Sequence, residues 1–254
     1  RVGGDLHAHN AAASELWRAF FSADEAHRRQ FALADGADSG GYHSSGMLGR
    51  YNAHRSGVIY EHDEAVPQLV EGVAFVERVE AWRGAVTALA QDVLGAVAAR
   101  RGAPADMFAA GGAFDARAAG RFHVKRTHAG AARVLLPAHR DPSTLSLVVH
   151  FSAPPSGLEV RTPRGWARCA RAGPGVVTVL AGSVLAAALP GVPAPTHRVV
   201  ADFDDDDRAP RLAATFFCEP RPDARMADVA GDTSDAPTYE TWRARSYKKY
   251  LKKP

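Results

Sequence analysis

After residue 119 the chain becomes a succession of short segments rich in β-branched and aromatic residues, separated by glycine, proline and other turn-forming residues. The clearest of these segments cover residues 121–126, 145–151, 157–162, 176–180, 197–203 and 211–217. Short strands joined at regular intervals by turns are typical of an antiparallel sandwich or barrel. We therefore expect an all-β core between residues 119 and 220.

Helical patterns flank this region on both sides. The strongest covers residues 66–100, where valine, leucine and tryptophan recur at threes and fours, and Gly102 with Pro104 should end it. Residues 11–34 are also expected to be helical, and Asp24 is placed to cap a second short helix there. Residues 238–251 form the last helical pattern of the chain.

The expected fold class is therefore mixed α/β, with an all-β core and flanking helices. We expect one domain over residues 1–254, in which 1–118 give mainly helical support, 119–220 form the core and 221–254 form a C-terminal helical segment. The most apolar run, residues 175–191, is too short and too broken by glycine and proline for a membrane helix. It is expected to form two buried strands on either side of residues 181–182.

Composition narrows the classes of function. The chain has 254 residues, 46% of them hydrophobic and 23% charged, which is ordinary for a globular protein. Its net charge of +3 lies largely in the basic C-terminal tail and does not indicate nucleic-acid binding. We expect a small-molecule substrate, no nucleic-acid partner, no membrane association and a monomer.

The two cysteines, Cys169 and Cys218, have neither the spacing of a zinc site nor the number of a disulfide framework. They fit a reducing compartment, so we expect a cytoplasmic location. The sequence begins with Arg1 rather than methionine, which is expected of a trimmed N-terminus.

His139 and Asp141 stand two residues apart at the edge of an apolar segment. Residues i and i+2 of a strand point to the same face, so the two side chains converge while Arg140 points away. His197, at the start of a later strand, supplies a third ligand. Two histidines and one carboxylate form the facial triad of non-haem Fe(II) oxygenases, which leaves coordination positions open. An H-x-D motif alone is weak evidence for a metal site, because a surface His–Asp pair at a turn has the same spacing.

Arg211 begins a later β-rich segment. A cation inside an apolar strand is costly unless it is paired, and the guanidinium geometry suits a carboxylate. The alternative partner is the acidic run Asp204–Asp207, which precedes it in the sequence.

The order of these motifs resembles that of the isopenicillin N synthase-like family of Fe(II)/2-oxoglutarate-dependent dioxygenases. The segments "HRD", "GLEV", "GWARC", "LAGSVL", "THRVV", "RLA" and "FFCEP" follow one another as the corresponding family motifs do. Nearer the N-terminus, "FFSADEAHRRQFA" and "GGYHSSG" match in outline. The resemblance covers nearly the whole chain. The first few dozen residues of the family pattern have no counterpart in it.

The resemblance implies a double-stranded β-helix, or jelly roll, with an N-terminal helical region and a C-terminal helix. It implies Fe(II) held by His139, Asp141 and His197, and 2-oxoglutarate whose distal carboxylate pairs with Arg211. Dioxygen then converts 2-oxoglutarate to succinate and CO2, and a small organic substrate is hydroxylated, desaturated or cyclised. The substrate pocket would include Tyr42, His43, Phe122, Phe217 and also Tyr239, although each of these also fits simple core packing.

Several positions depart from the family pattern. Ala213 replaces a serine that binds the co-substrate carboxylate, and Lys125 stands where a tyrosine commonly helps to hold 2-oxoglutarate. His123 replaces an asparagine. We predict that His123 and Lys125 belong to the co-substrate site, with Lys125 as an anchor; the alternative is that Lys125 is a solvated edge residue. His150 is interpreted as a pocket or core histidine, with a second metal ligand as the alternative.

These departures keep two other functions open. The first is an Fe(II) oxidase on the same scaffold that uses no 2-oxoglutarate, in which Arg211 binds a carboxylate of the substrate. The second is a jelly-roll binding module without catalysis, which an intact triad disfavours.

Overall fold

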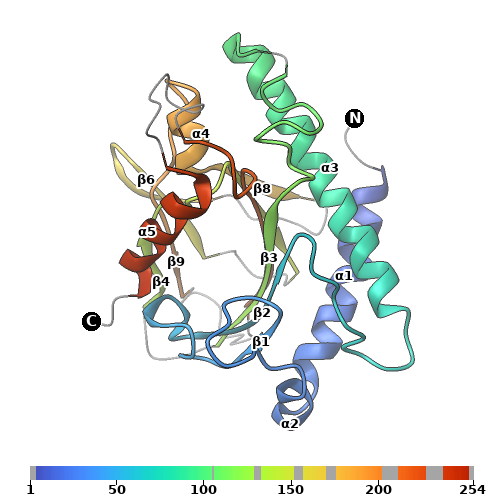
Figure 1. The fold of residues 1–254 in the computed structure, drawn as a ribbon. Helices are drawn as coiled ribbons and strands as arrows, with labels where there is room; N and C mark the ends of the chain where they lie inside the picture. Colours follow the sequence, from blue (N-terminus) through green and yellow to red (C-terminus); the bar gives the residue numbers. More distant parts are fainter. Residues whose placement is uncertain are drawn as a thin grey trace.

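Two antiparallel sheets form the centre of the molecule, which is a computed structural model (Figure 1). The structure describes residues 4–104, 106–128, 133–151, 157–169, 176–201, 211–226 and 237–251. The larger sheet has the order β1 (Gly41–His43), β2 (Arg55–Glu61), β3 (Gly120–Thr127), β10 (Arg211–Cys218), β5 (Leu145–His150) and β8 (Val177–Ala181). The smaller sheet has the order β4 (Val134–His139), β9 (His197–Val200), β6 (Leu158–Thr162) and β7 (Gly165–Arg168).

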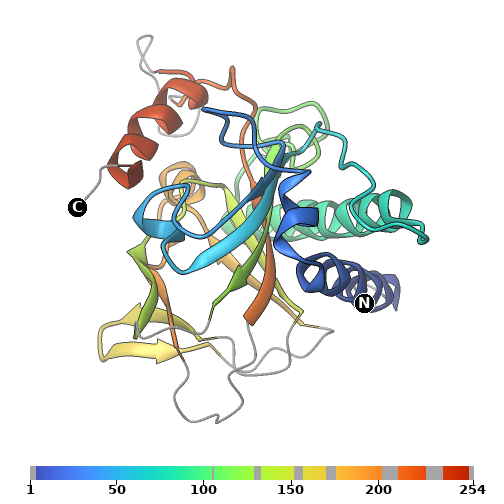
Figure 2. The same cartoon turned by 90° about the horizontal axis from the view of Figure 1, so that it is seen from below.

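Helices cover the outside of these sheets. The helical elements are α1 (Gly4–Ser22), α2 (Glu25–Arg29), η1 (Arg50–Asn52), α3 (Phe75–Arg101), α4 (Ser183–Ala188) and α5 (Tyr239–Leu251). Helices α1 and α3 lie side by side against the larger sheet, and α5 lies on the opposite flank (Figure 1, Figure 2). None of these described helices combines the length and the apolar character that crossing a membrane requires.

The main hydrophobic core lies between α1, α3 and the outer face of the larger sheet. Trp82 of α3 packs against Phe122, whose ring stacks on Phe216 of β10 with centroids 4.5 Å apart. All three side chains are nearly inaccessible to solvent. One face of the sheet is thereby used for packing, which leaves its other face for the cavity described below.

The structure begins the long helix later than the sequence predicted. The expected helix over 66–100 starts at Phe75, because Pro67 has no backbone N–H to donate and Gly72 adopts a φ of +73°. Its end is confirmed: Gly102 adopts a φ of +64° and its N–H bonds to carbonyls of the last turn.

Two strands lie in the region that was expected to be mainly helical. β1 and β2 pair antiparallel with each other, and β2 pairs with β3, so the larger sheet extends to residues well before 119. The sequence "RSGVIYE" of β2 does alternate, since Ser56, Val58 and Tyr60 are buried on the helix side. Part of the N-terminal region therefore belongs to the larger sheet. Without β2, the backbone N–H and C=O groups along one edge of β3 would have no partner strand.

The apolar run 175–191 contains one strand and one helix rather than two strands. β8 ends at Ala181, and the alanine-rich α4 follows directly. Gly182 lies against Ser143, and the Ser183 N–H donates to the carbonyl oxygen of Asp141 at 2.8 Å. This turn therefore holds the backbone of a predicted metal ligand.

Gly182→Ala is expected to lower the free energy of unfolding by about 1–3 kcal/mol, as overpacking in a closed site does. A Cβ at this position would overlap the backbone carbonyl of Ser143, which cannot move without displacing the turn. Gly84→Ala is the matched control, because nothing lies within 4 Å of a Cβ there and the residue is inside α3. That variant should be stabilised by about 0.5–1 kcal/mol. Denaturant unfolding measures both, and equal stability of the two variants would contradict the prediction.

Candidate metal centre and cofactor cavity

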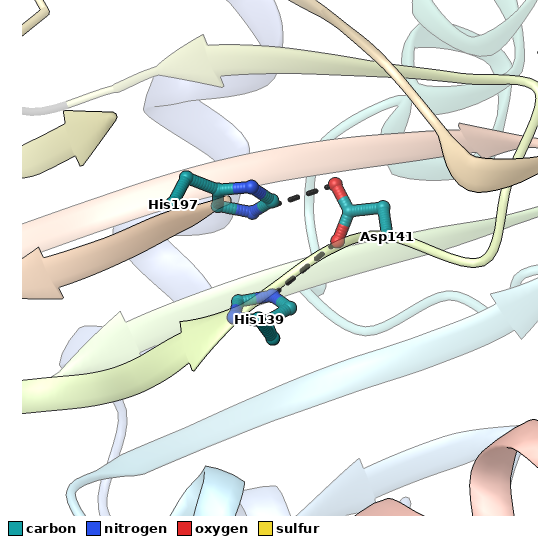
Figure 3. Close-up of side chains that lie close together, drawn as sticks. All are labelled: His139, Asp141 and His197. Atoms are coloured by element: carbon teal, nitrogen blue, oxygen red, sulfur yellow. Dashed lines mark ion pairs between the residues drawn. The ribbon is translucent and has the colours of Figure 1, made fainter. Parts of the chain in front are cut away.

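His139, Asp141 and His197 converge at one end of the smaller sheet (Figure 3). His139 is the last residue of β4, His197 is the first residue of β9, and the two are direct partners in the antiparallel register. The Nε2 atom of His139 lies 3.3 Å from Oδ1 of Asp141, and Nε2 of His197 lies 3.5 Å from Oδ2. The three candidate ligand atoms all lie within 4.8 Å of one another.

Backbone contacts define which ring nitrogen of each histidine faces Asp141. Nδ1 of His139 lies 2.8 Å from the carbonyl oxygen of Pro137, and Nδ1 of His197 lies 3.2 Å from that of Pro195. A carbonyl only accepts, so both Nδ1 atoms must donate, and the Nε2 atoms are the ring nitrogens that face Asp141. Burial lowers the pKa of His197, which favours its neutral form.

The Nε2 atoms of both histidines and the carboxylate of Asp141 therefore face one another. Ser146 holds the carboxylate in place by donating to Oδ2 of Asp141 at 2.6 Å. Two imidazoles with one carboxylate are a ligand set that suits a divalent transition metal. The residues present thus fit an Fe(II) ion.

A cavity of about 240 Å³ opens beside the triad, between the two sheets. Its lining contains the cationic side chains of Arg55, Arg121, Lys125 and Arg211. The apolar part of the lining comprises Leu48, Ile59, Leu136, Val148, Leu158, Leu180, Val199 and Phe217. The inner faces of β3 and β10 supply Arg121, His123, Lys125, Arg211 and Thr215, because the residues of these strands alternate between cavity and core.

Arg211 lies in this cavity as the first residue of β10. Its Nη2 lies 3.4 Å from Nδ1 of His150, and its Nε has no hydrogen-bond partner among the described residues. Burial lowers its pKa to about 10, so the guanidinium stays charged at neutral pH. The alternative partner, the run Asp204–Asp207, lies outside the described residues.

Lys125 is buried, which rules out the interpretation as a solvated edge residue. Its side chain extends sideways over Gly57 to His43, in a row that crosses three neighbouring strands. Nδ1 of His43 lies 3.1 Å from the carbonyl oxygen of Ser44 and must donate, so Nε2 accepts a hydrogen bond from Lys125 Nζ. Burial, together with the charge of Arg55, lowers the pKa of Lys125 well below its usual range.

His123 and Phe217 line the cavity, and their rings meet edge to face with centroids 4.7 Å apart. His150 is buried on the same face as Arg211. In the described ranges, only His139, Asp141 and His197 form a cluster with the composition of a metal site, so nothing supports a second metal at His150.

Four of the expected pocket residues do not line the cavity. Tyr42 packs on Phe20 and its hydroxyl donates to Glu25 at 3.0 Å. Phe122 points to the helix side of the sheet, and His43 lies beyond Lys125 at the sheet edge. The Tyr239 hydroxyl donates to the carbonyl oxygen of Pro142 at 2.9 Å, so α5 braces the turn next to Asp141. These four expectations were wrong. Strand alternation turns Tyr42 and Phe122 to the helix side of the sheet, His43 belongs to the edge strand, and Tyr239 belongs to α5.

The sequence analysis missed Arg55, Tyr51 and Arg121. Tyr51 packs its ring edge to face on His139, with centroids 5.6 Å apart, and Arg121 forms an ion pair with Asp38 at 3.0 Å. The sequence does contain one indication for Arg55, because it begins the short β-rich segment "RSGVIYE", which forms β2.

Comparison of the sequence with protein-family models and with curated proteins found no match. Solved structures do match over nearly the whole chain. A Caulobacter crescentus protein assigned to the 2OG-Fe(II) oxygenase family matches with a TM-score of 0.71 at 19% identity, covering 96% of this chain and 86% of that chain.

Neurospora crassa T7H, solved in complex with alpha-KG, matches with a TM-score of 0.74 at 18% identity, covering 97% of this chain and 83% of that chain. JOX2, solved with 2OG, Fe and JA, matches with a TM-score of 0.74 at 16% identity, covering 98% and 79%. The chain therefore has the fold of the 2OG-Fe(II) oxygenases. This confirms, at the level of the fold, the resemblance that the sequence motifs indicated.

Proposed function

We propose that this protein is a non-haem Fe(II)- and 2-oxoglutarate-dependent dioxygenase, with residues 1–254 forming a single double-stranded β-helix domain. The observation that carries the proposal is the meeting of two histidine Nε2 atoms and one carboxylate beside a cavity that also holds Arg211. The complexes of T7H with alpha-KG and of JOX2 with 2OG and Fe, on the same fold, support it.

The residues divide between metal and co-substrate. His139, Asp141 and His197 would hold Fe(II), and a set of three protein ligands would leave positions for other ligands. With 2-oxoglutarate and dioxygen, such a centre would supply an oxidant for C–H bonds, with release of succinate and CO2. Arg211 binds the distal carboxylate of 2-oxoglutarate, and its unpaired Nε supplies a donor for it.

Lys125 adds a second donor to this carboxylate. Its register partner across β3 and β10 is Ala213, which has no hydroxyl to offer. An amine carries up to three protons, so Lys125 can keep its bond to His43 and still donate to 2-oxoglutarate. His123 lies on the same face and completes the polar wall of the site.

The substrate is a small organic molecule. The cavity is mostly apolar and too small for a polymer segment. Structures of T7H with thymine and of JOX2 with JA show small ligands on this fold. Hydroxylation, desaturation and ring closure all remain within this class of reaction.

A second candidate is an Fe(II) oxidase that needs no 2-oxoglutarate, which the alanine at 213 and the lysine at 125 favour. Anaerobic titration with Fe(II), with and without 2-oxoglutarate, separates the two functions. A visible charge-transfer band that requires both components supports the dioxygenase. Iron binding without such a band supports the oxidase, and no iron binding would indicate a binding module.

Lys125→Met is expected to weaken 2-oxoglutarate binding about tenfold, since a sheltered charged donor to a carboxylate contributes about 1.5–3 kcal/mol. Methionine keeps most of the stem and should leave iron binding and folding unchanged. The charge-transfer band, titrated with 2-oxoglutarate, gives the dissociation constant. Arg164→Met, in the exposed β6–β7 turn, is the control for a lost positive charge outside the cavity.

The same interaction predicts a pH dependence. The pKa of Lys125 is depressed in the free site by burial and by Arg55, and a bound carboxylate raises it again. Binding therefore takes up a proton wherever the free Lys125 is neutral, so affinity falls as pH rises, by at most about tenfold per pH unit. His43, whose pKa burial lowers to about 3, stays neutral throughout. A pH profile in Lys125→Met as steep as that of the wild type would refute the anchor role.

A further inference from the structure

Arg55 is a cation of the cavity that the proposed chemistry leaves unused. It is the first residue of β2 and stands in one row with Thr127 of β3 and Arg211 of β10, on the cavity face of the sheet. Its Nε and Nη2 donate to the carbonyl oxygen of Tyr51 at 3.0 and 2.5 Å. Because the Tyr51 ring packs on His139, the guanidinium is anchored at the edge of the metal centre.

The charge of Arg55 has no counter-charge of its own. Within the part of the chain that the structure describes, Arg55 forms no ion pair, although the charge of Asp141 acts on it. Burial and the neighbouring Arg211 lower its pKa to about 10, which leaves it cationic at neutral pH. A half-buried cation without an opposite charge is costly, so its place in the cavity indicates an anion that arrives from outside.

The carboxylates among the described lining residues already have partners. They are Asp38 and Asp141. Asp38 pairs with Arg121, which also pairs with Glu61 at 2.5 Å. Fe(II) with Asp141 would carry one net positive charge and Arg211 carries another, which together balance the two carboxylates of 2-oxoglutarate. The positive charge of Arg55 is then in excess, whether Lys125 is neutral or protonated.

Apolar side chains form the surface next to Arg55. Ile59 lies on the same face of β2, and Leu48 and Leu136 line the same cavity. A ligand that satisfies both features has an apolar body and one anionic group.

We propose that Arg55 binds a carboxylate of the substrate, so that the substrate class is a small carboxylic acid with an apolar body. This inference rests on the proposed Fe(II)/2-oxoglutarate function. The fork of the guanidinium still offers Nη1, since the contacts to Tyr51 use Nε and Nη2. Arg55 thereby selects the substrate and directs its apolar body toward the metal centre.

The test compares carboxylates with their neutral amides on the wild-type protein loaded anaerobically with Fe(II) and 2-oxoglutarate. The probes are phenylacetate, 4-phenylbutyrate and octanoate, each paired with its own amide, and calorimetry measures binding. We expect at least one carboxylate to bind about tenfold or more tightly than its amide, as one charge-assisted bond implies. Arg55→Met should reduce this preference to within about twofold, and Arg55→Lys, which keeps the charge, should retain part of it.

Titration of the same variants with 2-oxoglutarate distinguishes the sources of the carboxylate. If Arg55→Met weakens 2-oxoglutarate as strongly as Arg211→Met does, Arg55 serves the co-substrate and the inference is overturned. It is also overturned if no probe carboxylate binds better than its amide. Wild-type protein that binds neither Fe(II) nor 2-oxoglutarate would instead overturn the proposed function, so the two failures are distinct.

Discussion

His139→Ala is expected to abolish metal binding and turnover together. The variant leaves one imidazole and one carboxylate, and a divalent transition metal loses a ligand of its facial triad. The measurement is the iron content per chain after anaerobic loading and desalting, for which we expect one equivalent in the wild type and essentially none in the variant.

His150→Ala is the matched control for this experiment. His150 is a buried histidine of the same region, but it lies beside Arg211 rather than in the triad. It should keep one iron per chain, and any change is expected in its 2-oxoglutarate affinity, through Arg211. An unchanged iron content in His139→Ala would refute the assigned ligands, and a lost equivalent in His150→Ala would reinstate a metal there.

Arg211→Lys is expected to raise the apparent constant for 2-oxoglutarate by about ten- to a hundredfold, with little effect on iron affinity. The substitution keeps the charge but loses the planar fork that binds a carboxylate through two parallel hydrogen bonds. A charged hydrogen bond of about 1.5–3 kcal/mol corresponds to this range. The concentration of 2-oxoglutarate at half-saturation of the charge-transfer band measures the effect.

Deletion of Asp204–Asp207 tests the other partner of Arg211. If Arg211 binds the co-substrate, the deletion should leave the constant for 2-oxoglutarate within about twofold of the wild type, because the guanidinium does not depend on the acidic run. A deletion that reproduces the Arg211→Lys effect would show that the arginine is structural.

The sequence by itself determined the features that depend on local order. The spacing of His139 and Asp141 keeps their side chains close together, and the later His197 completes the set, as the structure confirms. The expected common face of one strand is not found, because β4 ends at His139 and Asp141 lies just beyond it. The end of α3 at Gly102 and the character of the region after residue 119 also follow from local pattern. These predictions succeed because strand alternation and glycine conformation are properties of neighbouring residues.

Strand alternation in residues 120–127 predicts that His123 and Lys125 lie on one face of the strand and Phe122 on the other. The structure has this arrangement in β3. Phe122 was nominated for the pocket on resemblance, against its own alternation, and that nomination was wrong. Local pattern was the better guide at this position.

Tertiary structure alone decided which residues from distant segments share the cavity. Arg55 meets Arg211 because β2 and β10 both pair with β3, and no local pattern encodes that pairing. Lys125 reaches His43 because Gly57, on the strand between them, has no side chain to block the path. Such lateral contacts join residues that are far apart in the sequence, so they exist only once the sheet order and register are formed.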